Sequence, residues 1–347
     1  MEAIESMAKS FIVYSSTISL SLSYCYFFSS KFPKGIKRFI SLIPIFYLFT
    51  TLPLRCSSTF TTAVTFAFIT WLANFKLVRF AFDLDQSPYQ LSDSSLLKFI
   101  IFTSFPIKTT ENSVKRRSNR FQFQFQFKLG FQIVIYSVLV TTVLSFGTRF
   151  HPKVVSFIYG WLLFLMIDIV TAACDAVLVL VTGLELEPSS DEPYRATSLQ
   201  NFWGRWNLLV TNSLRNTVYK PVVVALRRRK WAPLAGVLAS FLVSGLMHEL
   251  FVYQLSRAAP TWEMTSFFMI HGVSVVVEMI VKREVAGGSW RLPEFVGWLL
   301  TMAFVVVTGV SLFVPPFIRE RVDVRMLQEY TSLVNFIKSV YLLIFHV

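Results

Sequence analysis

The chain has 347 residues, of which 54% are hydrophobic and only 15% are charged, and its formal net charge is +13. Average soluble proteins carry roughly 25% charged residues, so this chain lacks the charge to cover a water-facing surface. The composition excludes a disordered protein, a nucleic-acid-binding domain and an ordinary cytosolic enzyme, and it predicts an all-α integral membrane protein with basic loops.

Nine apolar runs follow one another along the chain, and most approach the roughly 20 residues that a spanning helix needs. They cover residues 11–29, 39–54, 59–75, 131–146, 154–182, 231–251, 264–281, 295–315 and 331–345. A further run, 96–107, is too short to cross and is expected to be re-entrant or interfacial. The chain is therefore predicted to be one polytopic membrane domain, residues 1–347, with roughly eight to ten membrane helices.

Basic residues gather in four of the connecting segments, 31–38, 108–128, 215–230 and 282–291. The positive-inside rule places such segments in the cytosol. Arg149, Lys153, Arg319, Arg321 and Arg325 fall on the other side and do not follow this rule.

An alternating Phe-Gln run occupies residues 121–127. Strict alternation is typical of a strand, but an isolated strand in a membrane has no partner for its backbone groups. We therefore expect an interfacial segment that inserts its phenylalanines beside the basic residues that precede it.

A polar stretch, residues 185–207, interrupts the apolar runs and ends in Ser-Leu-Gln-Asn-Phe-Trp-Gly-Arg-Trp-Asn. Trp203, Trp206 and Arg205 suit a membrane interface, where a ring is half buried and a cation stays wet. Asn201 and Asn207 add amide groups that are costly in lipid unless they line a cavity. Both interpretations, an interfacial anchor and a polar site at membrane depth, stay open at this point.

His248 and Glu249 form an ionisable pair inside an apolar run, and such residues are functional candidates by default. Val252 stands where an HExxH zinc motif needs its second histidine, so no metal site is predicted, and no GxSxG nucleophile elbow occurs. General acid–base chemistry remains, because free imidazole has a pKa of about 6.5. Successive helical residues point about 100° apart, so Glu249 is expected to pair with a basic side chain elsewhere.

Two other features of the apolar runs predict helix packing. Ser244 and Gly245 are small neighbours that would let another helix approach closely. His271 lies in an apolar run beside Gly272, and we expect it to form a hydrogen bond to a neighbouring helix.

These residues resemble the plant wax synthase-like branch of the membrane-bound O-acyltransferase superfamily. The resemblance is carried by residues 198–207, by Ser-Gly-Leu-Met-His-Glu-Leu at 244–250, by Pro106-Ile107-Lys108 and by Thr217-Val218-Tyr219-Lys220-Pro221. The branch usually has Asp-Phe-Trp-Gly-Arg-Arg-Trp-Asn, whereas here Asn201 replaces the Asp and one Arg is absent before Trp206. In a continuous helix that deletion turns the following residues by about 100°.

The resemblance implies an acyl-CoA-dependent O-acyltransferase of the endoplasmic reticulum membrane that esterifies a long-chain fatty alcohol or a sterol. It implies an internal tunnel for the lipid substrates, and no cofactor besides acyl-CoA as co-substrate. His248 is then the catalytic residue and Asn207 the second site residue. Substrate contacts are expected from Asn201, Trp203, Arg205, Trp206, Arg215 and Glu249.

Three alternatives remain open. A structural or lipid-sensing membrane protein would explain the Phe-Gln run and the basic segments, but not the polar motif together with His248. A membrane transporter would share the hydrophobicity and the buried histidine, but it should show inverted repeats or paired broken helices, and no convincing duplication is visible. An inactive relative of the acyltransferases would be consistent with the shortened motif.

Overall fold

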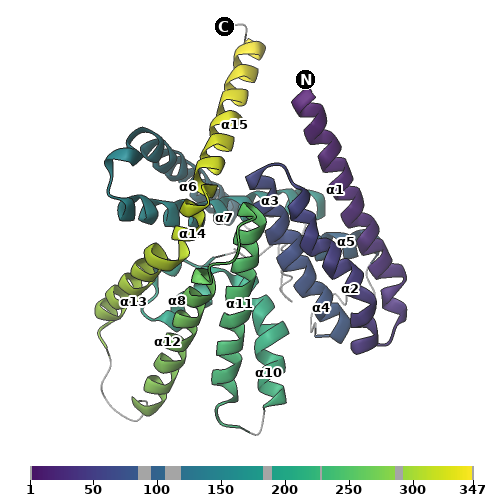
Figure 1. Ribbon diagram of the computed structural model, residues 1–347, viewed down its shortest axis with the longest axis vertical. Coiled ribbons are helices and arrows are strands. Elements are labelled where there is room, and N and C mark those ends of the chain that lie inside the picture. Colours follow the sequence, from purple (N-terminus) through teal and green to yellow (C-terminus); the bar gives the residue numbers. More distant parts are fainter. Residues whose placement is uncertain are drawn as a thin grey trace.

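The computed structural model describes residues 2–84, 95–105, 119–182, 190–226, 229–285 and 292–345, and every regular element within them is a helix (Figure 1). The all-α prediction is thereby confirmed. The α-helices are α1 (Glu2–Phe27), α2 (Ile36–Thr51), α3 (Thr59–Thr65), α4 (Asn74–Phe82), α5 (Leu96–Ser104), α6 (Asn119–Phe146), α7 (Pro152–Thr182), α8 (Leu199–Trp206), α9 (Leu208–Leu214), α10 (Lys220–Ala225), α11 (Ala232–Ser256), α12 (Glu263–Val285), α13 (Glu294–Thr308), α14 (Pro315–Arg319) and α15 (Val322–Phe345).

Three π-helical segments are inserted into these helices. They are η3 (Phe66–Ala73) between α3 and α4, η6 (Arg215–Tyr219) between α9 and α10, and η7 (Gly309–Phe313) between α13 and α14. Single π-helical turns inside α-helices are frequent at functional sites, because the wider turn changes which side chains share a face.

Helices form here because lipid offers no water to bond free backbone groups. Seven segments of the described chain are long and apolar enough to span a membrane: Ile36–Arg55, Thr59–Phe82, Leu129–Arg149, Pro152–Val177, Ala232–Ser256, Glu263–Val285 and Glu294–Arg319. The other two expected spans, 11–29 and 331–345, fall largely within α1 and α15. The nine-residue α5 is too short to cross, as expected.

Several sequence features lie partly or wholly outside the described residues. Pro106, Ile107 and Lys108 are among them, as are residues 183–189, Arg227 and Arg228. The alternating run 121–127 lies within α6 and is helical in its backbone. Its period of two therefore does not determine its secondary structure.

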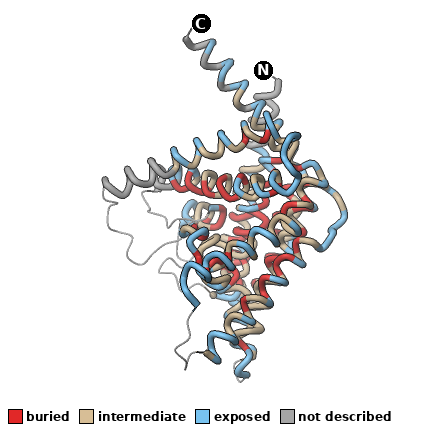
Figure 2. The backbone as a smooth tube through the Cα atoms, turned by 90° about the vertical axis from the view of Figure 1, so that its left-hand side faces the viewer, coloured by how far each residue is buried: buried red, intermediate tan, exposed pale blue. Residues whose placement is uncertain are grey.

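The helices form two groups that meet along α11 (Figure 1). One group, which contains α1, α2, α4 and α5, lies on the same side of α11 as α10, and the other, which contains α12 and α13, lies on the opposite side. The buried residues concentrate in the middle of the body, whereas α15 projects away from it (Figure 2). The first group has its own apolar core, which includes the fully buried Leu22, Leu42, Phe49, Leu77 and Phe99.

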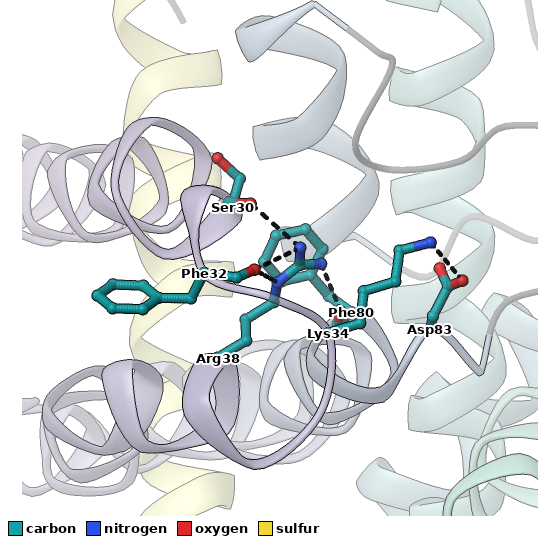
Figure 3. Close-up of polar contacts among 6 residues, drawn as sticks. All are labelled: Ser30, Phe32, Lys34, Arg38, Phe80 and Asp83. Carbon is teal, nitrogen blue, oxygen red and sulfur yellow. Dashed lines mark hydrogen bonds and ion pairs between the residues drawn. The ribbon is translucent and has the colours of Figure 1, made fainter.

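Arg38 is buried within this first group and ties the turn after α1 to the end of α4 (Figure 3). Its guanidinium donates hydrogen bonds to the carbonyl oxygens of Ser30, Phe32 and Phe80, at 2.9–3.3 Å, and lies 4.8 Å from the Phe80 ring centroid. Beside it, Lys34 pairs with Asp83 at 2.6 Å. The helix C-terminal carbonyls have no intrahelical partner, so a cation is a favourable partner for them.

Lys76 has a similar place in the same group of helices. It is 8% exposed, and its Nζ donates to the carbonyl oxygens of Phe102 and Phe105 at the end of α5. Arg38 and Lys76 are therefore buried cations that contribute to internal packing.

The C-terminal ends of α1, α10 and α12 lie toward the same end of the molecule, in the lower half of Figure 1. At the opposite ends of α11 and α12, arginines bond within the protein. Arg319 forms two hydrogen bonds of 2.8 Å with Glu263, and Arg325 donates to the Leu255 carbonyl at 3.1 Å. These two exceptions to the charge rule thus have structural partners.

Helices α11 and α12 pack at close range because each places a glycine at the contact. A Cβ added to Gly245 would lie 2.9 Å from the Thr265 Cα, and one added to Gly272 would lie 2.8 Å from the Phe241 Cβ. The expectation that Ser244 and Gly245 allow a close approach is confirmed. This packing places His248, on α11, against the side chains of α12.

Candidate active site

His248 is half-buried on α11, and its ring is oriented by the backbone of its own helix. Its Nδ1 lies 2.7 Å from the carbonyl oxygen of Ser244. A carbonyl oxygen only accepts, so Nδ1 carries the proton and the neutral ring keeps its lone pair on Nε2. Within the described residues, Nε2 has no hydrogen-bond partner. The ring is therefore prepared to accept a proton at Nε2.

Three aromatic rings from three different elements surround His248. The Phe268 ring lies 4.3 Å from it, the Trp71 ring 5.0 Å and the Phe313 ring 5.6 Å between centroids. Trp71 belongs to η3 and Phe313 to η7, so two of the three π-helical segments supply rings to this site. Aromatic walls exclude water from a base and are compatible with an apolar substrate.

His271 occupies a different environment, although it is only one helix away. Its Nδ1 accepts a hydrogen bond from the Trp203 Nε1 at 3.1 Å, and its Nε2 lies 2.8 Å from the Thr308 hydroxyl. Both nitrogens are therefore engaged, and the ring links α8, α12 and α13. The expectation of a helix-packing hydrogen bond is confirmed, and His248 is distinguished from His271 by its free nitrogen.

The polar motif forms α8, which lies along α12. The Ser198 hydroxyl caps α8 by accepting from the backbone N–H of Asn201 at 3.2 Å. The Glu278 carboxylate accepts from the backbone N–H of Gln200 at 3.2 Å, and Lys282 donates to the Ser198 hydroxyl. Together with the Trp203–His271 bond, these contacts attach the whole of α8 to α12.

The remaining motif side chains face different partners. Trp206 packs against Phe164 and Phe202, each at 5.3 Å between centroids. Arg205 lies 3.8 Å from the Asp191 carboxylate, and the Asp191 N–H bonds back to the Arg205 carbonyl at 2.9 Å. Arg205 is thus partly neutralised by its neighbour in the fold.

Asn207 interrupts the helix between α8 and α9. Its backbone is extended, with φ −148° and ψ 99°, and its Oδ1 caps α9 by accepting from the Val210 N–H at 3.1 Å. The Thr211 hydroxyl bonds to the Trp203 carbonyl at 3.1 Å and closes the break. The missing Arg shortens α8 just before this break, so the expected 100° rotation is not imposed on α9 through a continuous helix.

Asn207 retains chemical capacity after this capping. Its amide nitrogen has no hydrogen-bond partner within the described residues, so both N–H groups remain available. Among the residues that the structure describes, no hydrogen bond joins Asn207 to His248. Asn207 is linked to Trp203 through Thr211, which bonds to the carbonyl oxygens of both residues. The Trp203 ring in turn lies 5.5 Å from the Phe268 ring, which packs on His248.

Glu249 is 5% exposed and accepts a hydrogen bond from the backbone N–H of Thr265 at 3.1 Å. Thr265 lies in the first turn of α12, where unpaired N–H groups and the helix dipole favour a carboxylate. The expectation of a basic partner was wrong, because helix packing brings a helix N-terminus to this side chain. Glu249 and His248 therefore have different partners, as the helical spacing of about 100° predicts.

Arg215 begins the π-helical η6 and is exposed, with no ion pair within the described residues. Lys220, Arg229 and Lys230 are also exposed along this part of the chain. Three residues of the site carry no signal in the sequence: Trp71, Phe268 and Phe313. Each is an ordinary aromatic residue of an apolar span, and only packing selects them from the 36 phenylalanines and 8 tryptophans of the chain.

A cavity of about 600 Å³ lies elsewhere, between α6, α7 and α15, and it is lined by residues that include Val143, Tyr159 and Leu327. None of the predicted site residues lines it. The internal tunnel at His248 stays a prediction.

The region that contains α8 and His248 matches a known family. Residues 186–270 match the model of the membrane bound O-acyl transferase family. The long-chain-alcohol O-fatty-acyltransferase of Simmondsia chinensis is 39% identical over 90% of this chain and 91% of its own. The acyl-CoA–sterol O-acyltransferase 1 of Arabidopsis thaliana is 35% identical over 93% of this chain and 95% of its own.

The chain belongs to this family. As a wax synthase-like member of the membrane-bound O-acyltransferases, it is a multi-pass membrane acyltransferase. The family match spans both the helix break at Asn207 and the ring of His248.

Proposed function

We propose that this acyltransferase transfers a fatty acyl group from acyl-CoA to the hydroxyl of a long-chain alcohol and so makes a wax ester. The observation that carries the proposal is the free Nε2 of His248, set among aromatic rings in a membrane-embedded helix pair. A sterol is the second candidate acceptor, because a relative named as a sterol acyltransferase is 35% identical over most of the chain. Both acceptors present one hydroxyl on an apolar body.

His248 would act as general base and then as general acid. The alcohol O–H donates to Nε2, and its proton passes to Nε2 as the oxygen attacks the thioester carbonyl carbon. The C–S bond of the tetrahedral intermediate then breaks, and His248 returns the proton to the leaving sulfur. The products are an ester and free CoA, and the histidine ends as it began. General acid–base assistance of this kind typically contributes about 10²–10⁴-fold.

Asn207 would donate a hydrogen bond from its amide nitrogen to the carbonyl oxygen of the acyl group. The same side chain caps α9 through its Oδ1, so its amide is held in one orientation. Asn207→Ser tests the two roles separately, because serine is a good N-cap residue but has no amide N–H. We expect a stable protein with ester synthesis reduced about 10²–10³-fold, as for removal of one oxyanion donor.

The CoA end would bind at the end of the molecule that carries the exposed basic residues. Arg215, Lys220, Arg229 and Lys230 are available there, and guanidinium and ammonium groups bind phosphates through charge-assisted hydrogen bonds. Since acyl-CoA is cytosolic, this end would face the cytosol, and we propose the endoplasmic reticulum as the membrane. Co-localisation of a tagged protein with a marker of that membrane tests the location.

The function is tested in a yeast strain that lacks its own neutral-lipid acyltransferases. The strain expresses the full chain and is fed fatty alcohols or sterols, and its esters are quantified by mass spectrometry. We expect wax esters in excess over sterol esters. The reverse ratio would establish the second candidate, and substrate uptake without either ester would favour a transporter.

His248→Ala is the decisive variant, with His151→Ala as its matched control. His151 is exposed in the turn before α7, so its loss should leave ester synthesis unchanged. We expect His248→Ala to accumulate to the same level and make almost no ester. Wild-type amounts of ester from His248→Ala would overturn the assignment.

A further inference from the structure

Trp71 carries a buried hydrogen-bond donor that the fold does not use. The residue is 8% exposed, and its indole Nε1 has no accessible surface and no partner within the described residues. A tryptophan is normally buried only where its N–H reaches an acceptor, because an unpaired donor costs free energy. The same position could be filled by phenylalanine with no orphan donor.

The π-helical geometry of η3 directs Trp71 toward the site. In an α-helix, residues five apart lie about 140° apart around the axis, so Phe66 and Trp71 would face different neighbours. In this structure both face α11: Phe66 packs on Phe251 at 4.8 Å and Trp71 on His248 at 5.0 Å between centroids. The wider π turn therefore places the orphan donor beside the proposed base.

We propose that the indole N–H of Trp71 donates a hydrogen bond to the carbonyl oxygen of the acyl-CoA thioester during transfer. The inference rests on the proposed function of His248. Two groups on a bound substrate pair could accept this bond, the alcohol oxygen and the thioester carbonyl oxygen. A donor on the alcohol oxygen would hold the lone pair that must attack, whereas the carbonyl oxygen gains negative charge in the transition state.

The negative charge that develops on the carbonyl oxygen explains why the indole N–H of Trp71 is buried and unpaired. A hydrogen bond from a preorganised donor in a dry site strengthens as the negative charge develops, and no water has to reorganise. Trp71 would thus act in addition to the amide of Asn207, and two donors on one carbonyl oxygen are a common arrangement for acyl transfer. The steps of the reaction are those described for His248: the alcohol oxygen attacks the thioester carbonyl carbon, the C–S bond breaks, and the alcohol proton passes through His248 to the leaving sulfur.

Trp71→Phe tests the proposal, because it removes the N–H and keeps an aromatic ring against His248. Trp231→Phe is the matched control, since Trp231 is 50% exposed at the start of α11. Initial rates are measured in microsomes with acyl-CoA and a fatty alcohol, normalised to the amount of tagged enzyme. We expect kcat to fall by about 10²–10³-fold in Trp71→Phe, with KM values changed by less than threefold, and no change in Trp231→Phe.

Two outcomes would overturn the role of Trp71. One is a wild-type kcat in Trp71→Phe, and the other is an effect confined to the KM for the alcohol, which would place the bond on the acceptor. Thermal unfolding of the detergent-solubilised variant separates catalysis from folding, because removing an unpaired buried donor should leave the unfolding temperature within a few degrees. If Trp71→Phe unfolds at a markedly lower temperature than the wild type, Trp71→Tyr provides a second variant, whose side chain is larger than phenylalanine. Its kcat is expected to be low as well.

The failure of this proposal differs from failure of the proposed function. If His248→Ala is inactive and Trp71→Phe is fully active, only the role of Trp71 is wrong. If His248→Ala remains active, the function of the base is wrong, and the inference about Trp71 falls with it.

Discussion

The indole nitrogen of Trp203 lies 3.1 Å from Nδ1 of His271, and this bond attaches the polar motif of α8 to the middle of α12. The indole N–H can only donate, so Nδ1 of His271 is the acceptor and its other nitrogen donates to the Thr308 hydroxyl. The Thr308 hydroxyl in turn donates to the Phe304 carbonyl at 2.6 Å. A chain of hydrogen bonds thus crosses three helices beside the candidate active site.

This series of hydrogen bonds predicts a structural role for His271. His271→Phe keeps an aromatic ring but removes both hydrogen bonds, each of which contributes about 1 kcal/mol, and it leaves the N–H of the half-buried Trp203 unpaired. We expect unfolding free energy to fall by about 2–3 kcal/mol, measured as earlier thermal unfolding in detergent. His151→Ala is the control. Unchanged stability together with complete loss of ester synthesis would instead show a direct role of His271 in the chemistry.

The close contact between α11 and α12 is expected to require glycine at position 245. In Gly245→Ala the new Cβ would lie 2.9 Å from the Thr265 Cα, so the helix backbones would have to separate. Overpacking of this kind typically costs about 1–3 kcal/mol. The matched control is Gly160→Ala in α7, where a Cβ meets nothing within 4 Å. There the substitution should stabilise the helix by about 0.5–1 kcal/mol, so the two variants should shift thermal unfolding in opposite directions.

Glu249 is expected to stabilise α12 rather than to bind substrate. Glu249→Ala removes the acceptor for the Thr265 N–H in the first turn of α12 and should cost about 0.5–2 kcal/mol, as for loss of a helix cap. Glu249→Gln retains an acceptor oxygen and should recover part of that loss. KM for acyl-CoA and for the alcohol should stay at the wild-type values in Glu249→Gln. A raised KM without any change in stability would contradict this prediction.

The buried side chain of Arg38 is expected to stabilise the packing of the first group of helices. Arg38→Met removes the hydrogen bonds to three carbonyl oxygens, and hydrogen bonds to charged groups contribute about 1.5–3 kcal/mol each. We expect a loss of about 3 kcal/mol or more and poor accumulation of the full chain. Lys37→Met, at an exposed neighbouring position, should be close to neutral. Equal accumulation of the two variants would show that the Arg38 contacts contribute little.

The sequence alone determined much of this protein. Long apolar runs in a chain with 15% charged residues dictate helices, because a membrane leaves the backbone no other partner. An ionisable residue in such a run is rare enough that His248 could be singled out, and Gly245 beside Ser244 was sufficient to predict a close helix contact. Each of these features is local, so it can be found from residue type and spacing.

Only the tertiary structure decided which nitrogens and carboxylates are free. His248 and His271 both lie in apolar runs, and the state of their ring nitrogens differs because Trp203 and Thr308 reach one ring and not the other. Glu249 found a backbone N–H instead of a basic side chain, because a hydrogen-bond partner is chosen by packing between distant segments. Trp71 reached His248 only because a π-helical turn changed the face on which it lies, and no periodicity of the apolar run indicates that turn.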